Sequence, residues 1–170
     1  MICLEKESFV AEFGAVYEHS PWVANAVFDQ ARVDCLDTTN LDATSLAALF
    51  ETAFMAASRQ QQLGVLRAHP ALACGRAERD SLSDDSRQEQ SGAGLDQCTD
   101  TEFQLFREMN AMYFSKFDFP FIIAVKGRNK EQILAAFRER LANTMQTEFQ
   151  TAEQQVCQIA RLRIEVILGD

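Results

Sequence analysis

Apolar residues recur every three or four positions along most of this 170-residue chain, which is the period of an amphipathic helix. Ser20 and Pro21 are typical of an N-cap and a first helical position, and Pro70 disfavours a helical backbone at the residue before it. The pattern predicts helices over about residues 5–18, 20–33, 84–96, 100–117, 129–142 and 146–168, one that begins near Thr44 or Ser45, and a short one that ends at or before His69.

The segment Phe119–Val125 is strand-like, but no second run of its kind exists to pair with it. It is therefore equally compatible with an extended, buried connection. Residues 71–85 are small and polar and predict a loop. With no internal repeat or linker, the chain is expected to form one all-α domain over residues 1–170, a single-domain helical bundle of about seven to eight helices.

The charge balance narrows the range of partners. Sixteen Lys and Arg residues face 25 Asp and Glu residues, which gives a net charge of −9. This sign argues against non-specific binding to nucleic acid or to an anionic membrane surface, and no apolar run is long enough to span a bilayer. An anionic small molecule would need a local positive site to counter the overall field.

The cysteines and histidines do not suggest a metal site. Five cysteines are widely spaced without a CxxC pair, and the two histidines lie far apart. We expect reduced thiols rather than a disulfide framework or a zinc cluster. The first residues lack the pattern of a signal peptide, so the predicted location is the cytoplasm.

Polar residues on apolar helical faces are the candidates for function, because burial without a partner is costly. Arg163 falls inside the apolar stripe of the last predicted helix. It could form a structural ion pair with an internal carboxylate or bind a substrate carboxylate or carbonyl, and the pattern leaves both open. Asn110 lies among aromatic residues of its helix and is better explained as an amide that ties a loop to that helix.

His69 is a candidate general acid or base. His69 is predicted at a helix end with an extended backbone, which suits the presentation of its side chain into a cleft. His19, in contrast, is expected to be a loop or helix-end residue. Further along, Ser86, Glu89 and Gln90 share one helical face. The Ser-x-x-Glu spacing is also that of a capping box, although Ser83 and Asp84 offer earlier caps.

These residues carry a resemblance to a known family. The motifs Leu66–Ala73, Ser86–Asp96, Asn110–Tyr113, Lys116–Ile122, Val125–Arg128 and Ile159–Arg163 occur in order along nearly the whole chain. In these motifs the chain resembles OHCU decarboxylase, 2-oxo-4-hydroxy-4-carboxy-5-ureidoimidazoline decarboxylase of urate breakdown.

The resemblance implies an all-helical homodimer that needs no cofactor or metal and converts its anionic ureidoimidazoline substrate to (S)-allantoin. The matching positions make His69 and Glu89 the catalytic pair. They place Pro70, Ser86, Gln90, Phe119, Ile122 and Arg163 in substrate binding, with the contacts at Phe119 and Ile122 made by backbone groups.

The chain departs from the family pattern at two positions. Ala71 stands where Asp often follows His-Pro, and Asp118 stands where Phe-Gly-Phe is usual, which puts the backbone contacts after it in question. Two alternatives to the decarboxylase remain at this point. One is a non-catalytic helical interaction module, and the other is a lyase or hydrolase acting on a related ureido acid.

Overall fold

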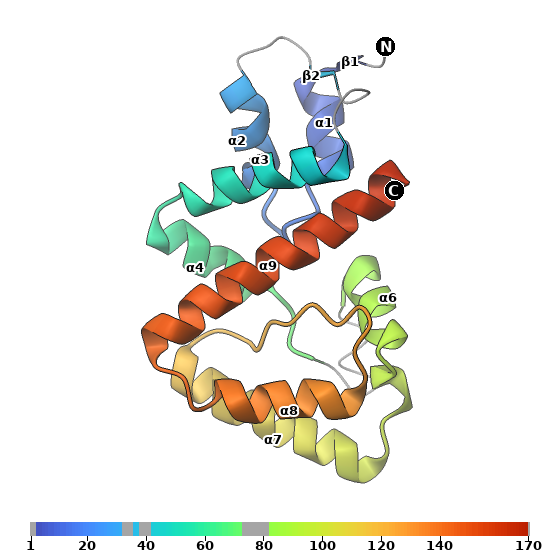
Figure 1. The fold of residues 1–170 in the computed structure, drawn as a ribbon, viewed down its shortest axis with the longest axis vertical. Helices are drawn as coiled ribbons and strands as arrows, with labels where there is room; N and C mark the ends of the chain where they lie inside the picture. Colours follow the sequence, from blue (N-terminus) through green and yellow to red (C-terminus); the bar gives the residue numbers. More distant parts are fainter. Residues whose placement is uncertain (1–2, 32–35, 38–41, 73–81, 170) are drawn as a thin grey trace. The chain divides into compact units, whose positions relative to one another are not determined.

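A computed structural model describes residues 3–31, 36–37, 42–72 and 82–169 (Figure 1). The chain divides into two compact units. The first unit comprises Met1–Ala68 with Val156–Asp170, and the second comprises His69–Gln155. Each unit is described by itself below.

The described residues of the first unit form four helices, a short strand pair and the C-terminal half of α9. The helices are α1 (Lys6–Phe13), α2 (Trp22–Ala31), α3 (Ala43–Met55) and α4 (Arg59–Ala68), and α9 as a whole is Met145–Leu168. Strand β1 (Cys3–Leu4) pairs antiparallel with β2 (Leu36–Asp37). The core of the first unit is a cluster of aromatic rings: Phe9, Phe13, Tyr17, Phe28, Phe50 and Phe54.

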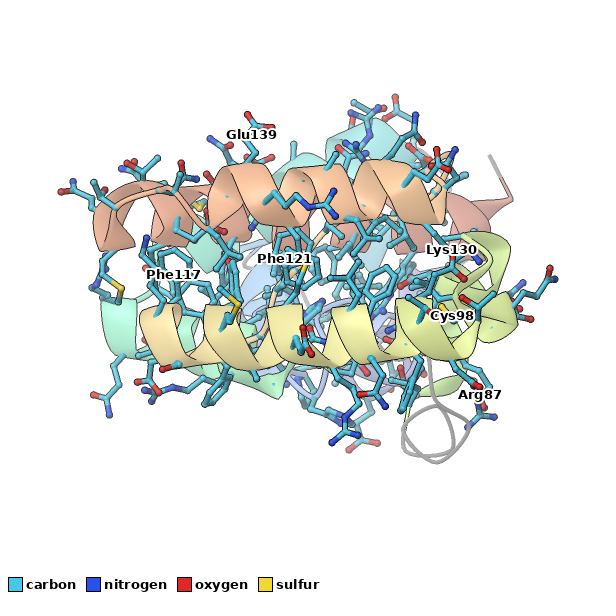
Figure 2. All side chains as sticks on the ribbon, turned by 90° about the horizontal axis from the view of Figure 1, so that it is seen from below. Arg87, Cys98, Phe117, Phe121, Lys130 and Glu139 are labelled. Carbon is cyan, nitrogen blue, oxygen red and sulfur yellow. The ribbon has the colours of Figure 1, made fainter. Side chains whose placement is uncertain are left out.

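The second unit contains α6 (Asp84–Gly92), the 3-10 helix η2 (Leu95–Gln97), α7 (Asp100–Phe117), α8 (Lys130–Arg140) and the first part of α9. Helices α7 and α8 lie side by side, and Phe117 and Phe121 point into the space between them (Figure 2). The rings of Phe121 and Phe137 stack at 3.7 Å between centroids, so this core is also aromatic.

The all-α prediction is confirmed, with eight α-helices in the described part of the chain. Helix α7 matches its predicted bounds because a capping box formed by Thr99 and Glu102 fixes its start. Helix α1 is shorter than predicted and ends at Phe13, with Gly14 as its C-cap. The two-residue strands were not predicted, because a pairing this short leaves no period in the sequence. The loop predicted over 71–85 lies mostly outside the described residues.

Three further expectations have different outcomes. Cys98 is disulfide-bonded, so the prediction of reduced thiols is wrong for this residue. Within the described ranges, no helix is long and apolar enough to cross a membrane. That the whole chain is one domain stays a prediction.

Candidate active site

His69 directly follows the last residue of α4, as the proline after it predicts. Its side chain is buried, with 7% of its surface exposed. A buried imidazole in a non-helical backbone fits a group held for proton transfer rather than a solvated surface histidine. His19, in contrast, is exposed and adopts a positive φ of 49°.

Helix α6 presents Ser86, Glu89 and Gln90. Ser83 is its N-cap and accepts a hydrogen bond from the backbone N–H of Ser86, so Ser86 lies within the first turn. The capping-box explanation of Ser86 and Glu89 is therefore wrong, because the N-cap of α6 is Ser83, one of the two earlier candidates. Ser86 and Gln90 are buried, while Glu89 is half-buried.

Two side-chain amides tie the segment after His69 to the helices of the second unit. Gln90 Nε2 donates to the carbonyl of Ala71 at 3.4 Å, and Asn110 Nδ2 donates to the carbonyl of Leu72 at 2.8 Å. The first bond links the segment that follows the His-Pro motif to α6. The second confirms that Asn110 ties a loop to its helix.

Among the described residues, Phe119–Val125 belongs to no helix and pairs with no strand, so it is a buried connection rather than a strand of a sheet. Phe119 and Ile122 are buried at 1% and 2% exposure. Asp118 precedes them as the C-cap of α7 in the left-handed conformation, with φ 62° and ψ 24°. Because Asp tolerates this conformation, the turn that glycine makes easily is formed here without it.

Sequence reasoning missed a buried ion pair beneath this segment. Arg140, the last residue of α8, pairs with Glu148 near the start of α9, and its Nη1 donates to the carbonyl of Ile122 at 2.7 Å. The sequence did contain a signal for this buried cation. On one helical face lie Ile133, Phe137 and Arg140, so the Arg140 guanidinium falls on an apolar stripe.

Arg163 lies in the first unit and is buried there. Its Nη1 donates to Glu18 Oε2 at 2.9 Å and to the carbonyl of Ala15 at 3.3 Å. Of the two explanations left open by the sequence, the ion pair with an internal carboxylate is present. A guanidinium carries five N–H donors, so this pair does not by itself exclude a second, ligand-binding role. The other predicted site residues all belong to the second unit.

The described residues hold no group of three or more His, Cys, Asp or Glu side chains that could bind a metal ion. What the second unit gathers is an imidazole, a carboxylate, small polar groups on one helical face and an extended backbone. This set can orient a polar anion and move a proton.

Comparison with known proteins places this set of residues in a family. The family model described as OHCU decarboxylase matches residues 3–165. The chain is 38% identical over 161 residues to the 2-oxo-4-hydroxy-4-carboxy-5-ureidoimidazoline decarboxylase of Haloferax volcanii, covering 95% of this chain and 89% of that protein. It is 35% identical over 165 residues to the protein of the same name from Amia calva, covering 97% and 90%.

Solved structures share the fold. A crystal structure of (S)-allantoin synthase superposes with a TM-score of 0.73 at 29% identity, over 96% of this chain and 51% of that chain. A structure of OHCU decarboxylase in the presence of (S)-allantoin gives 0.71 at 22% identity, over 94% and 99%. Matches that run nearly end to end in sequence and in structure leave one conclusion: this chain belongs to the OHCU decarboxylase family.

Proposed function

We propose that this protein is a carboxy-lyase that decarboxylates 2-oxo-4-hydroxy-4-carboxy-5-ureidoimidazoline to (S)-allantoin in urate breakdown. The observation that carries the proposal is the family match over residues 3–165, supported by full-length relatives that bear this enzyme's name. The bifunctional uric acid degradation protein of Bacillus subtilis contains a region 32% identical to 98% of this chain, which fits the same pathway.

The reaction breaks the bond between a ring carbon and its carboxylate, releases CO₂ and leaves an electron pair in the ring. Neighbouring carbonyl and nitrogen functions of the substrate can delocalise that pair, so no electron-sink cofactor is required. A proton must then reach one face of the ring. The protein's task is to orient the substrate and to deliver that proton stereospecifically.

We assign proton handling to His69 and Glu89. His69 is buried in the segment that Gln90 ties to α6, and the half-buried Glu89 lies one position before Gln90. Ser86, Gln90 and the backbone around Phe119 and Ile122 are proposed to bind the ring and ureido oxygens. Pro70 is proposed to line the pocket, and Arg163 to bind the carboxylate.

The assembly and the location of the protein are also proposals. We propose a homodimer, which sedimentation of the purified chain tests directly. The cytoplasm is proposed as the location, although the disulfide at Cys98 removes reduced thiols as support for it. Fractionation of cells that express the full-length protein tests this.

The decisive experiment generates the substrate in situ by enzymatic oxidation of urate and hydrolysis of 5-hydroxyisourate, then follows circular dichroism with and without the protein. We expect rapid appearance of (S)-allantoin, because spontaneous decay gives a racemic product. Racemic allantoin at the spontaneous rate would indicate a non-catalytic module. Rapid substrate loss without (S)-allantoin would indicate a different lyase or hydrolase.

Variants test the assigned residues. His69→Ala should lower kcat by about 100-fold or more, the usual range for loss of a general acid or base. The matched control is His19→Asn, because Asn tolerates the positive φ at this exposed position. Glu89→Gln keeps the shape and removes the charge, so it separates proton transfer from orientation. Near-normal turnover by His69→Ala would end the assignment.

A further inference from the structure

In the part of the chain that the structure describes, Phe119–Val125 has no strand partner to satisfy its buried backbone, and side chains bond to several of its main-chain groups. The backbone N–H of Ala124 donates to Gln155 Oε1 at 3.0 Å, and the carbonyl of Ala124 accepts from Arg128 Nε at 3.2 Å. The carbonyl of Ile122 accepts from Arg140 Nη1 at 2.7 Å. The path of this backbone therefore depends on a few individual side chains.

Arg140 is itself held from several directions. Its Nε donates to Glu148 Oε1 at 2.8 Å and its Nη2 to the same oxygen at 2.5 Å. Tyr113 donates its hydroxyl to this oxygen as well, and Asn143 donates to Glu148 Oε2 at 2.7 Å. The guanidinium carbon lies 4.5 Å from the centroid of the Phe121 ring. Both members of the ion pair are buried, and Glu148 is fully so.

A buried ion pair is weak evidence of stabilisation, because desolvating two charges costs about as much as their attraction returns. Its more specific property here is geometric. The rigid guanidinium fork uses one edge on Glu148 and leaves Nη1 aimed at a single main-chain carbonyl. A lysine ammonium could neutralise Glu148 but could not hold both groups in fixed directions.

We propose that Arg140, anchored by Glu148, is a positioning residue for the substrate-binding backbone at Phe119–Ile122. Arg140 acts through the carbonyl of Ile122 and the ring of Phe121, and has no part in proton transfer. This inference rests on the proposed function, which assigns substrate contacts to the same backbone. Tyr113 and Asn143 complete the anchor through their hydrogen bonds to Glu148, and the Tyr113 ring also packs edge-on against the ring of Phe121.

The test compares Arg140→Lys with Arg138→Lys, an exposed arginine two positions earlier on α8. Arg140→Lys should raise KM by about tenfold with kcat nearly kept, because a displaced backbone contact weakens binding in the ground and transition states alike. It should also speed amide hydrogen exchange at residues 119–125. Arg138→Lys should change neither quantity.

Two further variants keep the test decisive if Arg140→Lys does not fold. Glu148→Gln retains the shape of the anchor and should raise KM in the same direction, by a smaller factor. Tyr113→Phe removes the hydroxyl that donates to Glu148 and accepts from Arg140 Nη2 at 3.5 Å, but it keeps the ring and the contact between Arg140 and Ile122, so KM should stay at the wild-type value. Equal effects of Tyr113→Phe and Glu148→Gln on KM would overturn the inference.

Failure of the proposed function gives a different pattern. If the wild-type protein does not turn over the substrate, the function is wrong, whereas exchange at residues 119–125 still reports whether Arg140 holds the segment. If the wild type is active and Arg140→Lys behaves like Arg138→Lys in both KM and exchange, the positioning role is wrong and the function stands.

Discussion

Glu18 and Arg163, 145 residues apart in sequence, form an ion pair of 2.9 Å in which both side chains are buried. The pair links the segment between α1 and α2 to α9 within the first unit. Because the two charges are buried together, their contributions to stability and to substrate binding can be separated by paired substitutions.

Glu18→Ala leaves the Arg163 guanidinium without its carboxylate. We expect the free energy of unfolding in urea to fall by about 3–5 kcal/mol, as for other broken buried pairs. Glu18→Leu combined with Arg163→Met should recover much of this loss, since no buried charge remains. If the double variant is stable but binds substrate poorly, Arg163 also binds substrate; full activity in the stable double variant would assign Arg163 a structural role alone.

Asp118 holds a left-handed conformation at the end of α7. Asp118→Val should lower the free energy of unfolding by about 1–2 kcal/mol, because a β-branched side chain is strained at this φ. Asp118→Gly should match or exceed the wild type, and its KM should remain unchanged if the turn is already the one glycine makes. Urea unfolding checks the stabilities, and a large KM change in Asp118→Gly would contradict the interpretation.

Glu102 should make stability depend on acid pH. The hydrogen bond from Lys130, followed by those from the backbone and side chain of Thr99, lowers the pKa of Glu102 from 4.5 to about 2. A lowered folded-state pKa contributes stability above the unfolded value that is lost as the pH falls toward 2. The Tm difference between wild type and Glu102→Gln should therefore be largest near neutral pH and vanish near pH 2. Glu108→Gln, an exposed change on the same helix, should show no such trend.

Asn110 ties α7 to the segment that carries His69. Asn110→Ala should lower the free energy of unfolding by about 1–2 kcal/mol, because the buried Leu72 carbonyl loses its donor. If the tie also positions His69, kcat should fall too. Gln104→Ala, an exposed change on α7, is the control for helix propensity and should leave both quantities unchanged.

Local signals account for what the sequence could predict. Capping residues such as Thr99, and the proline after His69, mark helix boundaries through contacts within a few residues, and the structure follows them. The sequence also places Arg163 on an apolar stripe. It could not identify Glu18 as the partner of Arg163, because pairing across 145 positions depends on tertiary packing that no local pattern encodes.

The same limit applies to the candidate site. The motifs identify His69 and the residues of α6, but only the structure shows that Gln90 reaches the Ala71 carbonyl and that Arg140 reaches the carbonyl of Ile122. The strand-like run at Phe119–Val125 was ambiguous for the same reason. Whether an apolar extended segment joins a sheet depends on whether a second strand is available.

In a sheet, neighbouring backbones hold a strand whatever side chains it carries, so its course tolerates sequence drift. The course of Phe119–Val125 instead depends on the identity of Arg128, Arg140 and Gln155. Single substitutions at Arg140 on α8 or Gln155 on α9 can therefore shift the main chain of this segment, with no change in the residues of the segment itself. Selection for altered substrates would then act on helical positions that touch no ligand, and libraries for redesigning this enzyme should include them.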